Sequence, residues 1–204
     1  MKRGDRFTIF DEAGKERILE VQDIDRRSIT AHVKESVSRN SEAKVRVSLY
    51  QAIPKKPALF ELIVQKATEI GVSEIFPLIT ERTENRRMSK FDRLHVIAME
   101  ATEQSGRTKI PVIHHPVNYD EILPKQKNGF IAYEYEGEKY LSDYAKELTG
   151  AKELSIIIGP EGGLSKKEIE LAKKHKIHSF TFGPRILRTE TAAISALSLV
   201  LLNR

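Results

Sequence analysis

The stretch that decides the fold reads Leu154-Ser-Ile-Ile-Ile-Gly-Pro-Glu-Gly-Gly-Leu-Ser165. Its three consecutive isoleucines, Ile156 to Ile158, are typical of a strand that is buried on both faces. The glycines that follow allow the backbone to approach a ligand closely. Ser165 and Glu168 then have the spacing of a capping box, which predicts a helix through about His175. We therefore expect a strand, a tight loop and a helix.

A second unit of the same kind contains Thr181-Phe-Gly-Pro-Arg-Ile-Leu-Arg-Thr-Glu-Thr-Ala192. Phe180 to Phe182 is the expected strand, and an apolar helix is expected from Glu190 to the end of the chain. Open α/β sheets bind ligands at the carboxyl ends of neighbouring strands, so these two loops predict a ligand site. The alternative is two ordinary strand-to-helix turns, because glycine is common in such turns.

The chemistry of the first loop limits the ligand. Neither loop matches the phosphate-binding patterns G-x-x-x-x-G-K-[ST] or G-x-G-x-x-G. The carboxylate of Glu161 would repel a polyphosphate but would tolerate a neutral or cationic ligand. S-adenosylmethionine, which carries a sulfonium, suits this electrostatics better than ATP or NAD.

Further sequence blocks accompany the two loops, Gly159-Pro-Glu-Gly-Gly163 and Gly183-Pro-Arg-Ile-Leu-Arg-Thr-Glu-Thr-Ala192. Upstream lie Gln65-Lys-Ala-Thr-Glu-Ile-Gly71 with Pro77-Leu-Ile-Thr-Glu-Arg82, and Glu100-Ala-Thr-Glu-Gln-Ser-Gly-Arg107. Together, from roughly Lys55 to the C-terminus, these blocks resemble the RsmE family of ribosomal RNA methyltransferases in the SPOUT superfamily. Four blocks in the family's order are far more specific than any one of them.

This resemblance implies an S-adenosylmethionine-dependent methyltransferase that modifies ring nitrogen N3 of a uridine in 16S (small-subunit) ribosomal RNA. It also implies a SPOUT-type parallel α/β sheet with a C-terminal trefoil knot, and a homodimer. Two alternatives remain open. One is a SPOUT methyltransferase acting on transfer RNA or on a ribose hydroxyl, and the other is a non-catalytic RNA-binding protein in ribosome assembly.

The resemblance also assigns site residues. The cofactor-binding positions are Tyr133, Glu134, Ile158, Gly159, Pro160, Glu161, Gly162, Gly163, Phe182, Gly183, Ile186 and Leu187. The candidate catalytic residues are Arg107, Arg188 and Glu190, of which Arg107 would hold the phosphate or the base from the same or the partner subunit. A carboxylate can accept the imide proton of uracil, and a guanidinium can stabilise the resulting anion. For Arg188 and Glu190, a structural pair with a helix cap is the alternative interpretation.

Composition sets the broad class. The 204 residues are 40% hydrophobic and 31% charged, which is typical of a soluble globular protein. The chain has no cysteine, its six histidines lack metal-ligand spacing, and its start lacks an apolar signal core. The longest apolar stretch, Thr191 to Leu202, is too short to span a bilayer. We therefore expect a cytoplasmic protein without a metal site or a membrane partner.

The basic residues indicate a polyanionic partner. The net charge is +5 and the isoelectric point about 9.3. Composition alone favours a lysine-rich solvated surface. The placement of the arginines shifts the interpretation toward RNA, because Arg82, Arg86 and Arg87 gather in one loop and Arg107, Arg185 and Arg188 lie in or near the proposed ligand loops. The candidate RNA-binding residues are Arg82, Arg86, Arg87, Arg107 and Arg185.

The chain divides near residue 40. Residues 1–36 show three short strand patterns, at Arg6 to Phe10, Arg17 to Ile24 and Ser28 to Val33. Residues 37–43 are the expected linker, and residues 44–204 the methyltransferase domain, whose repeated strand-helix pattern predicts about six largely parallel strands. The resemblance implies a PUA-like RNA-binding β-barrel for the first part. Relatives usually carry a further stretch before the Gly4-Asp5 turn, so this barrel is either N-terminally shortened or completed differently.

Overall fold

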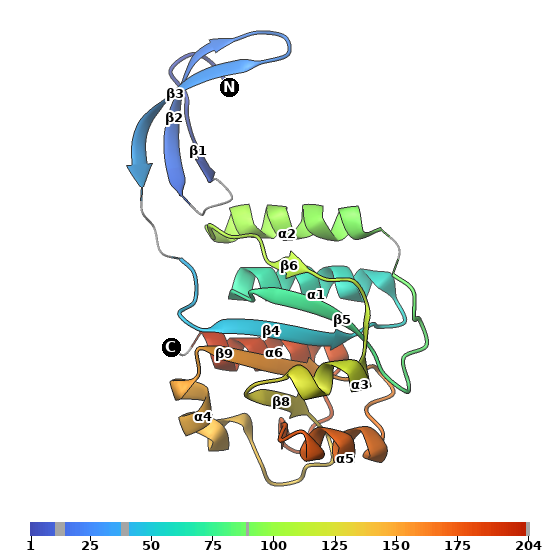
Figure 1. Cartoon of the computed structure of the whole chain (residues 1–204). Helices are drawn as coiled ribbons and strands as arrows, with labels where there is room; N and C mark the ends of the chain where they lie inside the picture. Colours follow the sequence, from blue (N-terminus) through green and yellow to red (C-terminus); the bar gives the residue numbers. More distant parts are fainter. Residues whose placement is uncertain (11–14, 38–40, 89, 203–204) are drawn as a thin grey trace.

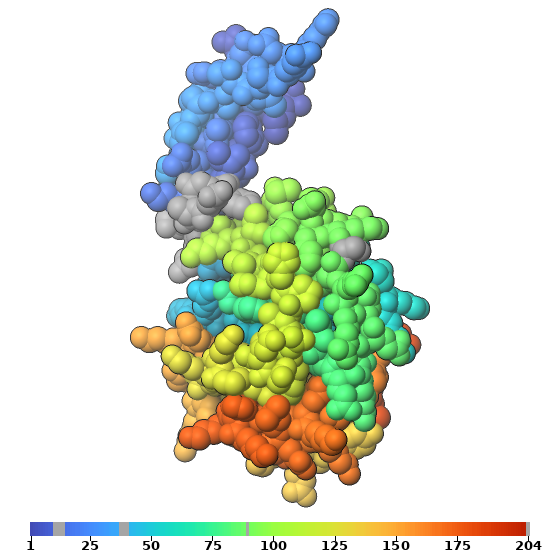
Figure 2. Space-filling view, turned by 45° about the vertical axis from the view of Figure 1, so that its right-hand side comes forward, coloured from blue at the N-terminus to red at the C-terminus, as the bar shows by residue number. Residues whose placement is uncertain are grey.

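Two separate sheets make up the computed structural model, which describes residues 1–10, 15–37, 41–88 and 90–202. A small antiparallel sheet comes first, and a larger parallel sheet with helices on both faces follows (Figure 1). The N-terminal sheet stands away from the body that the rest of the chain forms (Figure 2). The expected α/β class with a parallel sheet is confirmed, and the sheet has seven strands where about six were predicted.

The N-terminal sheet contains three strands in the order β1-β2-β3. They are β1 (Arg6–Phe10), β2 (Glu16–Ile24) and β3 (Ile29–Val37). Of its large apolar side chains, Val21 is buried, whereas Ile29 and Val33 are about half exposed, at 49% and 50%. Three strands alone cannot enclose a core, so the described residues form an open sheet rather than a closed barrel.

The seven strands of the second sheet all pair in parallel, in the order β10-β8-β9-β4-β5-β6 with β7 also on β5. They are β4 (Arg46–Ala52), β5 (Glu74–Ile79), β6 (Val112–Ile113), β7 (Val117–Asn118), β8 (Gly129–Ala132), β9 (Glu153–Ile158) and β10 (His178–Phe180). The helices are α1 (Pro57–Ile70), α2 (Phe91–Ser105), α3 (Tyr119–Ile122), η1 (Leu123–Lys125), η2 (Leu141–Tyr144), α4 (Ala145–Gly150), α5 (Lys166–Lys174) and α6 (Thr189–Leu201).

Each face of this sheet has its own core. Ile156 and Ile158 of β9 belong to the cluster formed with α1, α2 and α6. Ile157, between them, points to the opposite cluster, which α3, η1 and α5 cover. All three isoleucines are at most 2% exposed, as the sequence predicts for a strand buried on both faces.

Local signals determine several element ends. Gly71 ends α1 at φ +111°, in the left-handed region that favours glycine. The capping box at the start of α5 is confirmed, because Ser165 N donates to Glu168 Oε2 at 2.8 Å and Glu168 N donates to Ser165 Oγ at 3.3 Å. The helix ends at Lys174, with His175 as its C-cap.

Two details differ from the sequence prediction. The strand expected at Phe180 to Phe182 ends at Phe180, because Gly183 N donates to Thr181 Oγ1 and Gly183 turns the chain away at φ +94°. The two ligand loops follow β9 and β10, which are not direct neighbours. Strand β8 lies between them, and its own end therefore joins the same site.

Candidate cofactor and catalytic site

A cavity of about 590 Å³ lies at the carboxyl ends of β8, β9 and β10, beside the starts of α1 and α6. Its volume is within the usual range of small-molecule sites, roughly 300–1,000 Å³. Most of the predicted cofactor-binding residues line it: Tyr133, Glu134, Ile158, Gly159, Pro160, Glu161, Gly163, Phe182, Ile186 and Leu187. Gly162 and Gly183 belong to the same loops but do not line the cavity.

Two glycines of the β9 loop have no room for a side chain. A Cβ on Gly159 would lie 2.9 Å from Leu164 Cγ. A Cβ on Gly163, whose backbone has φ +69°, would clash with the Glu134 carboxylate. A side chain at either position would therefore displace a neighbouring side chain, and at Gly163 it would also strain the backbone.

Neighbouring loops hold the β9 loop in place. Glu161 Oε1 accepts a hydrogen bond from Lys55 N at 3.0 Å, just after β4. Arg82 Nη1 donates to Gly162 O at 2.7 Å from the loop after β5. The Glu161 carboxylate thus orders the cavity wall, in addition to contributing negative charge to it. Arg82, predicted to bind RNA, contacts the β9 loop.

A buried chain of hydrogen bonds joins three elements beneath the cavity. Gln51 of β4 donates through Nε2 to Thr189 Oγ1 at 2.8 Å, and Thr189 Oγ1 donates to Gly159 O at 2.7 Å. Because a hydroxyl has one proton, the donation from Gln51 directs that proton to Gly159. The chain therefore fixes the start of α6 against the β9 loop.

A second buried network supports the same loop from its far end. Glu168 Oε1 accepts from Glu81 N at 2.8 Å, and Ser165 Oγ lies 2.8 Å from Glu81 Oε2. Through these hydrogen bonds the Glu168 carboxylate, which is 8% exposed, joins the start of α5 to the loop after β5.

Arg188 and Glu190 both line the cavity at the start of α6. Within the described part of the chain, neither side chain forms an ion pair or a hydrogen bond, and Arg188 makes no side-chain cap bond to α6. The structural pair considered as their alternative role is therefore not formed. Arg185 lines the same cavity and is exposed.

The charges around the cavity are mixed. Glu134, Glu161 and Glu190 contribute carboxylates, while Lys55, Lys56, Arg185 and Arg188 contribute cations. Burial raises the pKa of Tyr133, and the nearby Glu134 carboxylate acts in the same direction. Tyr133 is therefore a neutral phenol that can donate a hydrogen bond.

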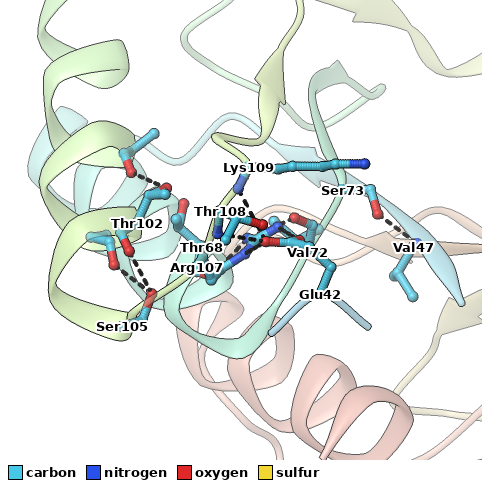
Figure 3. A network of polar contacts seen from close by, with 12 residues as sticks. Glu42, Val47, Thr68, Val72, Ser73, Thr102, Ser105, Arg107, Thr108 and Lys109 are labelled. Atoms are coloured by element: carbon cyan, nitrogen blue, oxygen red, sulfur yellow. Dashed lines mark hydrogen bonds and ion pairs between the residues drawn. The ribbon is translucent and has the colours of Figure 1, made fainter. Parts of the chain in front are cut away.

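Arg107 lies elsewhere, as Figure 3 shows. Its side chain is 5% exposed and does not line the cavity. Nη2 lies 2.7 Å from Glu42 Oε2, and Nη1 donates to Thr68 O and Val72 O at the end of α1. Within one chain, Arg107 therefore does not lie with Arg188 and Glu190 at the cavity. The N–H donors of the Arg107 side chain instead bind Glu42 and the end of α1.

The sequence prediction missed several lining residues: Lys55, Lys56, Leu59, Ala132, Leu164, Thr181, Thr189 and Ala192. Lys55 and Lys56 had a detectable signal, because they follow the strand-like pattern Val45 to Ala52 and therefore lie at the same edge of the sheet. The remaining predicted RNA-binding residues, Arg86 and Arg87, are exposed in the loop after β5.

Comparison with known proteins identifies the family. A family model described as an RNA methyltransferase domain matches residues 41–201. The chain belongs to the RNA methyltransferase family. It is 32% identical, over 98% of its length and 82% of the relative's, to the ribosomal RNA small subunit methyltransferase E of Rickettsia conorii. The resemblance to the RsmE family is thereby confirmed.

Solved structures of this family superimpose on nearly the whole chain. A Legionella pneumophila methyltransferase, in complex with the bound cofactor SAM, has a TM-score of 0.88 and 33% identity, covering 100% of this chain and 85% of that one. The ribosomal RNA small subunit methyltransferase E of Neisseria gonorrhoeae, bound to S-adenosyl methionine, has a TM-score of 0.89 and 28% identity, with coverages of 98% and 83%.

The described residues include neither a group suited to a metal ion nor a helix suited to a membrane. No three of their histidine, aspartate or glutamate side chains form a group that could hold a metal ion. No helix among them is both long and apolar enough to cross a membrane.

Proposed function

We propose that this protein is an S-adenosylmethionine-dependent methyltransferase of 16S ribosomal RNA. The observation that carries the proposal is the cavity at the ends of β8, β9 and β10, which brings together the glycine loop with the unpaired Arg188 and Glu190. Relatives named as small-subunit ribosomal RNA methyltransferases cover nearly the whole chain and support the substrate class.

The cavity suits S-adenosylmethionine on physical grounds. Gly159 and Gly163 carry no side chain that would project into the cavity, so a ligand can lie close to the backbone of the β9 loop. Ile158, Leu164 and Leu187 offer apolar surface for an adenine, and Glu134 and Glu190 offer carboxylates compatible with a cationic ligand. When bound, S-adenosylmethionine supplies an electrophilic methyl group.

The finer proposal concerns the acceptor, uridine N3. That nitrogen carries a weakly acidic imide proton and becomes a good nucleophile only when the proton leaves. Glu190 would accept this proton, while the Arg188 guanidinium would stabilise negative charge on the two uracil carbonyl oxygens. The chain's task is to hold N3 in line with the bond that breaks, and the rigid junction at Thr189 serves that positioning.

One experiment tests this function. Small-subunit ribosomal RNA from a deletion strain is incubated with the purified protein and S-adenosylmethionine, and its nucleosides are analysed by mass spectrometry. We expect 3-methyluridine to be formed. Methylation of transfer RNA or of a ribose hydroxyl would replace the proposed target, and cofactor binding without turnover on any RNA would favour a non-catalytic protein.

The chain's organisation is part of the proposal. We propose an RNA-binding, PUA-like unit at residues 1–36, a linker at 37–43, of which 38–40 lie outside the described residues, and a methyltransferase domain at 44–204. The basic residues Arg3, Arg6, Arg26 and Arg27 around the N-terminal sheet support RNA contact. The cytoplasm, where ribosomal RNA is modified, is the proposed location.

The C-terminal helix supports two more proposals, a trefoil knot and a homodimer. Helix α6 packs on α1 and β9, and Thr189 ties its start to the β9 loop, which places the last helix beside the loop that a knot would involve. Leu199 and Leu202 are 50% and 65% exposed, which leaves apolar surface for a second copy. A stable monomer in sedimentation at micromolar concentration would refute the dimer.

A further inference from the structure

A second cavity, of about 100 Å³, lies beside the site described above. It is lined by Ile53, Pro54, Pro57, Phe60, Glu61, Asn85, Arg87, Met88, Lys90 and Leu94. The start of α1 separates the two cavities, because Lys55, Lys56 and Leu59 line the larger one. Their sequence neighbours Pro54, Pro57 and Phe60 line the smaller one. Both cavities are therefore at the same edge of the sheet, on the two sides of the start of α1.

The floor of the second cavity is apolar. Ile53, Phe60 and Leu94 are at most 4% exposed, and Pro54 is buried beside them. For scale, an engineered apolar cavity of about 150 Å³ in another protein binds benzene. A cavity of about 100 Å³ that opens to solvent can accept much of a single pyrimidine-sized ring.

The rim of the cavity is cationic. Arg87 and Lys90 are exposed, and within the described residues neither side chain has an ion-pair partner. The Glu61 carboxylate is held by Arg93, whose Nε lies 2.7 Å from Glu61 Oε1. The carboxylate of the rim is therefore neutralised by a third cation, and the remaining charge at the opening is positive.

We propose that this second cavity holds the base of a nucleotide that flanks the methylated one, with Arg87 and Lys90 contacting its phosphate. An apolar slot with an arginine and a lysine at its mouth complements a flat base attached to an anion. Neighbouring cavities on one edge suit neighbouring nucleotides of one strand. This inference rests on the proposed function and adds a recognition subsite to it.

Two variants test the subsite. Asn85→Trp places an indole at the mouth of the cavity, and the double variant Arg87→Ala/Lys90→Ala removes the cations without touching the buried floor. Lys146→Ala/Lys152→Ala is the matched control, because it removes two exposed lysines near α4, outside both cavities. The ligands are short ribosomal RNA fragments that the wild type methylates, each with one base removed near the target.

The wild type should lose affinity roughly tenfold for the fragment that lacks one particular flanking base, since the stacking of that base on the protein is lost. Asn85→Trp should bind the intact fragment as weakly as the wild type binds that abasic one, and should show no further loss with it. The double alanine variant should bind all fragments more weakly and with a smaller salt dependence. The lysine control should keep the wild-type abasic sensitivity.

The outcomes separate the two proposals. A wild type that binds S-adenosylmethionine in calorimetry and methylates the fragment, together with an Asn85→Trp variant that keeps full abasic sensitivity, would overturn the subsite alone. A wild type that binds neither cofactor nor RNA would overturn the proposed function and the subsite with it. Unchanged cofactor affinity in Asn85→Trp is required for a supporting result.

Discussion

Arg188 and Glu190 are charged side chains at the cavity without partners among the described residues. Replacing either side chain should therefore leave the fold intact and lower the rate of methyl transfer. We expect Arg188→Ala and Glu190→Gln to lower single-turnover methylation by roughly 10²-fold or more, as for other electrostatic and acid–base groups. Cofactor affinity, measured by calorimetry, should change little. Near-normal methylation by a folded variant would exclude that residue from the mechanism.

Gly163 tests the cofactor loop at the same scale. Gly163→Val should abolish S-adenosylmethionine binding, because its Cβ would meet Glu134 and its φ of +69° disfavours a branched side chain. Gly106→Val is the matched control, since Gly106 has φ +68° but open space around it and lies outside the cavity. Both variants carry similar backbone strain, of order 1–3 kcal/mol. Equal cofactor affinity in the two variants would dissociate the glycine loop from cofactor binding.

At the scale of elements, Gln51 and Thr189 connect β4, the β9 loop and α6. Thr189→Val keeps the shape of the side chain but removes both hydrogen bonds of its hydroxyl. We expect it to weaken cofactor affinity at least several-fold, because Gly159 and the start of α6 lose their common support. Thr189→Ser should retain most of the affinity. A valine variant that binds like the serine variant would show that the chain of hydrogen bonds does not position the site.

The elements themselves were largely predictable from the sequence because their signals are local. The isoleucines of β9, the capping box at Ser165 and the glycine that ends α1 act within one or two turns of chain. The β9 and β10 loops could be placed at one sheet edge because the carboxyl ends of parallel strands lie at the same edge. The sequence could not supply the strand order, in which β8 lies between β9 and β10. This order explains why Tyr133 and Glu134, which follow β8 and were predicted by resemblance alone, line the same cavity.

Long-range partners explain why some contacts could not be foreseen from the sequence. Gln51 bonds to a residue 138 positions later, and Arg107 to one 65 positions earlier. Neither pair has a periodicity or spacing that a sequence motif reports. A lone arginine after a helix-ending glycine, next to proposed ligand blocks, predicted chemistry at Arg107. Within one chain its side chain is buried at the end of α1, and its role in the reaction stays a prediction.

At the scale of the whole molecule, the Arg107–Glu42 pair determines where the linker joins the methyltransferase body. Glu42 accepts hydrogen bonds from the Arg107 side chain and from the backbone N–H groups of Thr108 and Lys109 (Figure 3). The pair thus fixes the chain a few residues after β3, from which the N-terminal sheet projects.

The protonation of Glu42 should make this attachment pH-dependent. Burial alone would raise the pKa of Glu42, but the Arg107 guanidinium and the two backbone donors outweigh it and lower that pKa below its ordinary value of about 4.3. A carboxyl with a lowered folded pKa contributes stability above its unfolded pKa, and the contribution is lost as the pH falls through the folded pKa. The pair is therefore intact at neutral pH and fails in acid.

Glu42→Gln tests this attachment through thermal unfolding. At pH 7 we expect the free energy of unfolding of the variant to be about 1–3 kcal/mol lower than that of the wild type, since the buried Arg107 guanidinium loses its charged acceptor. For a chain of this length each kcal/mol corresponds to roughly 2–4 °C in Tm. The difference in Tm should shrink as the pH falls below about 4, because the wild-type carboxyl then becomes neutral as well. Glu103→Gln, an exposed carboxyl on α2, is the control and should show no such difference. A Tm gap for Glu42→Gln that stays constant down to pH 3 would mean that shape, rather than charge, determines this contact.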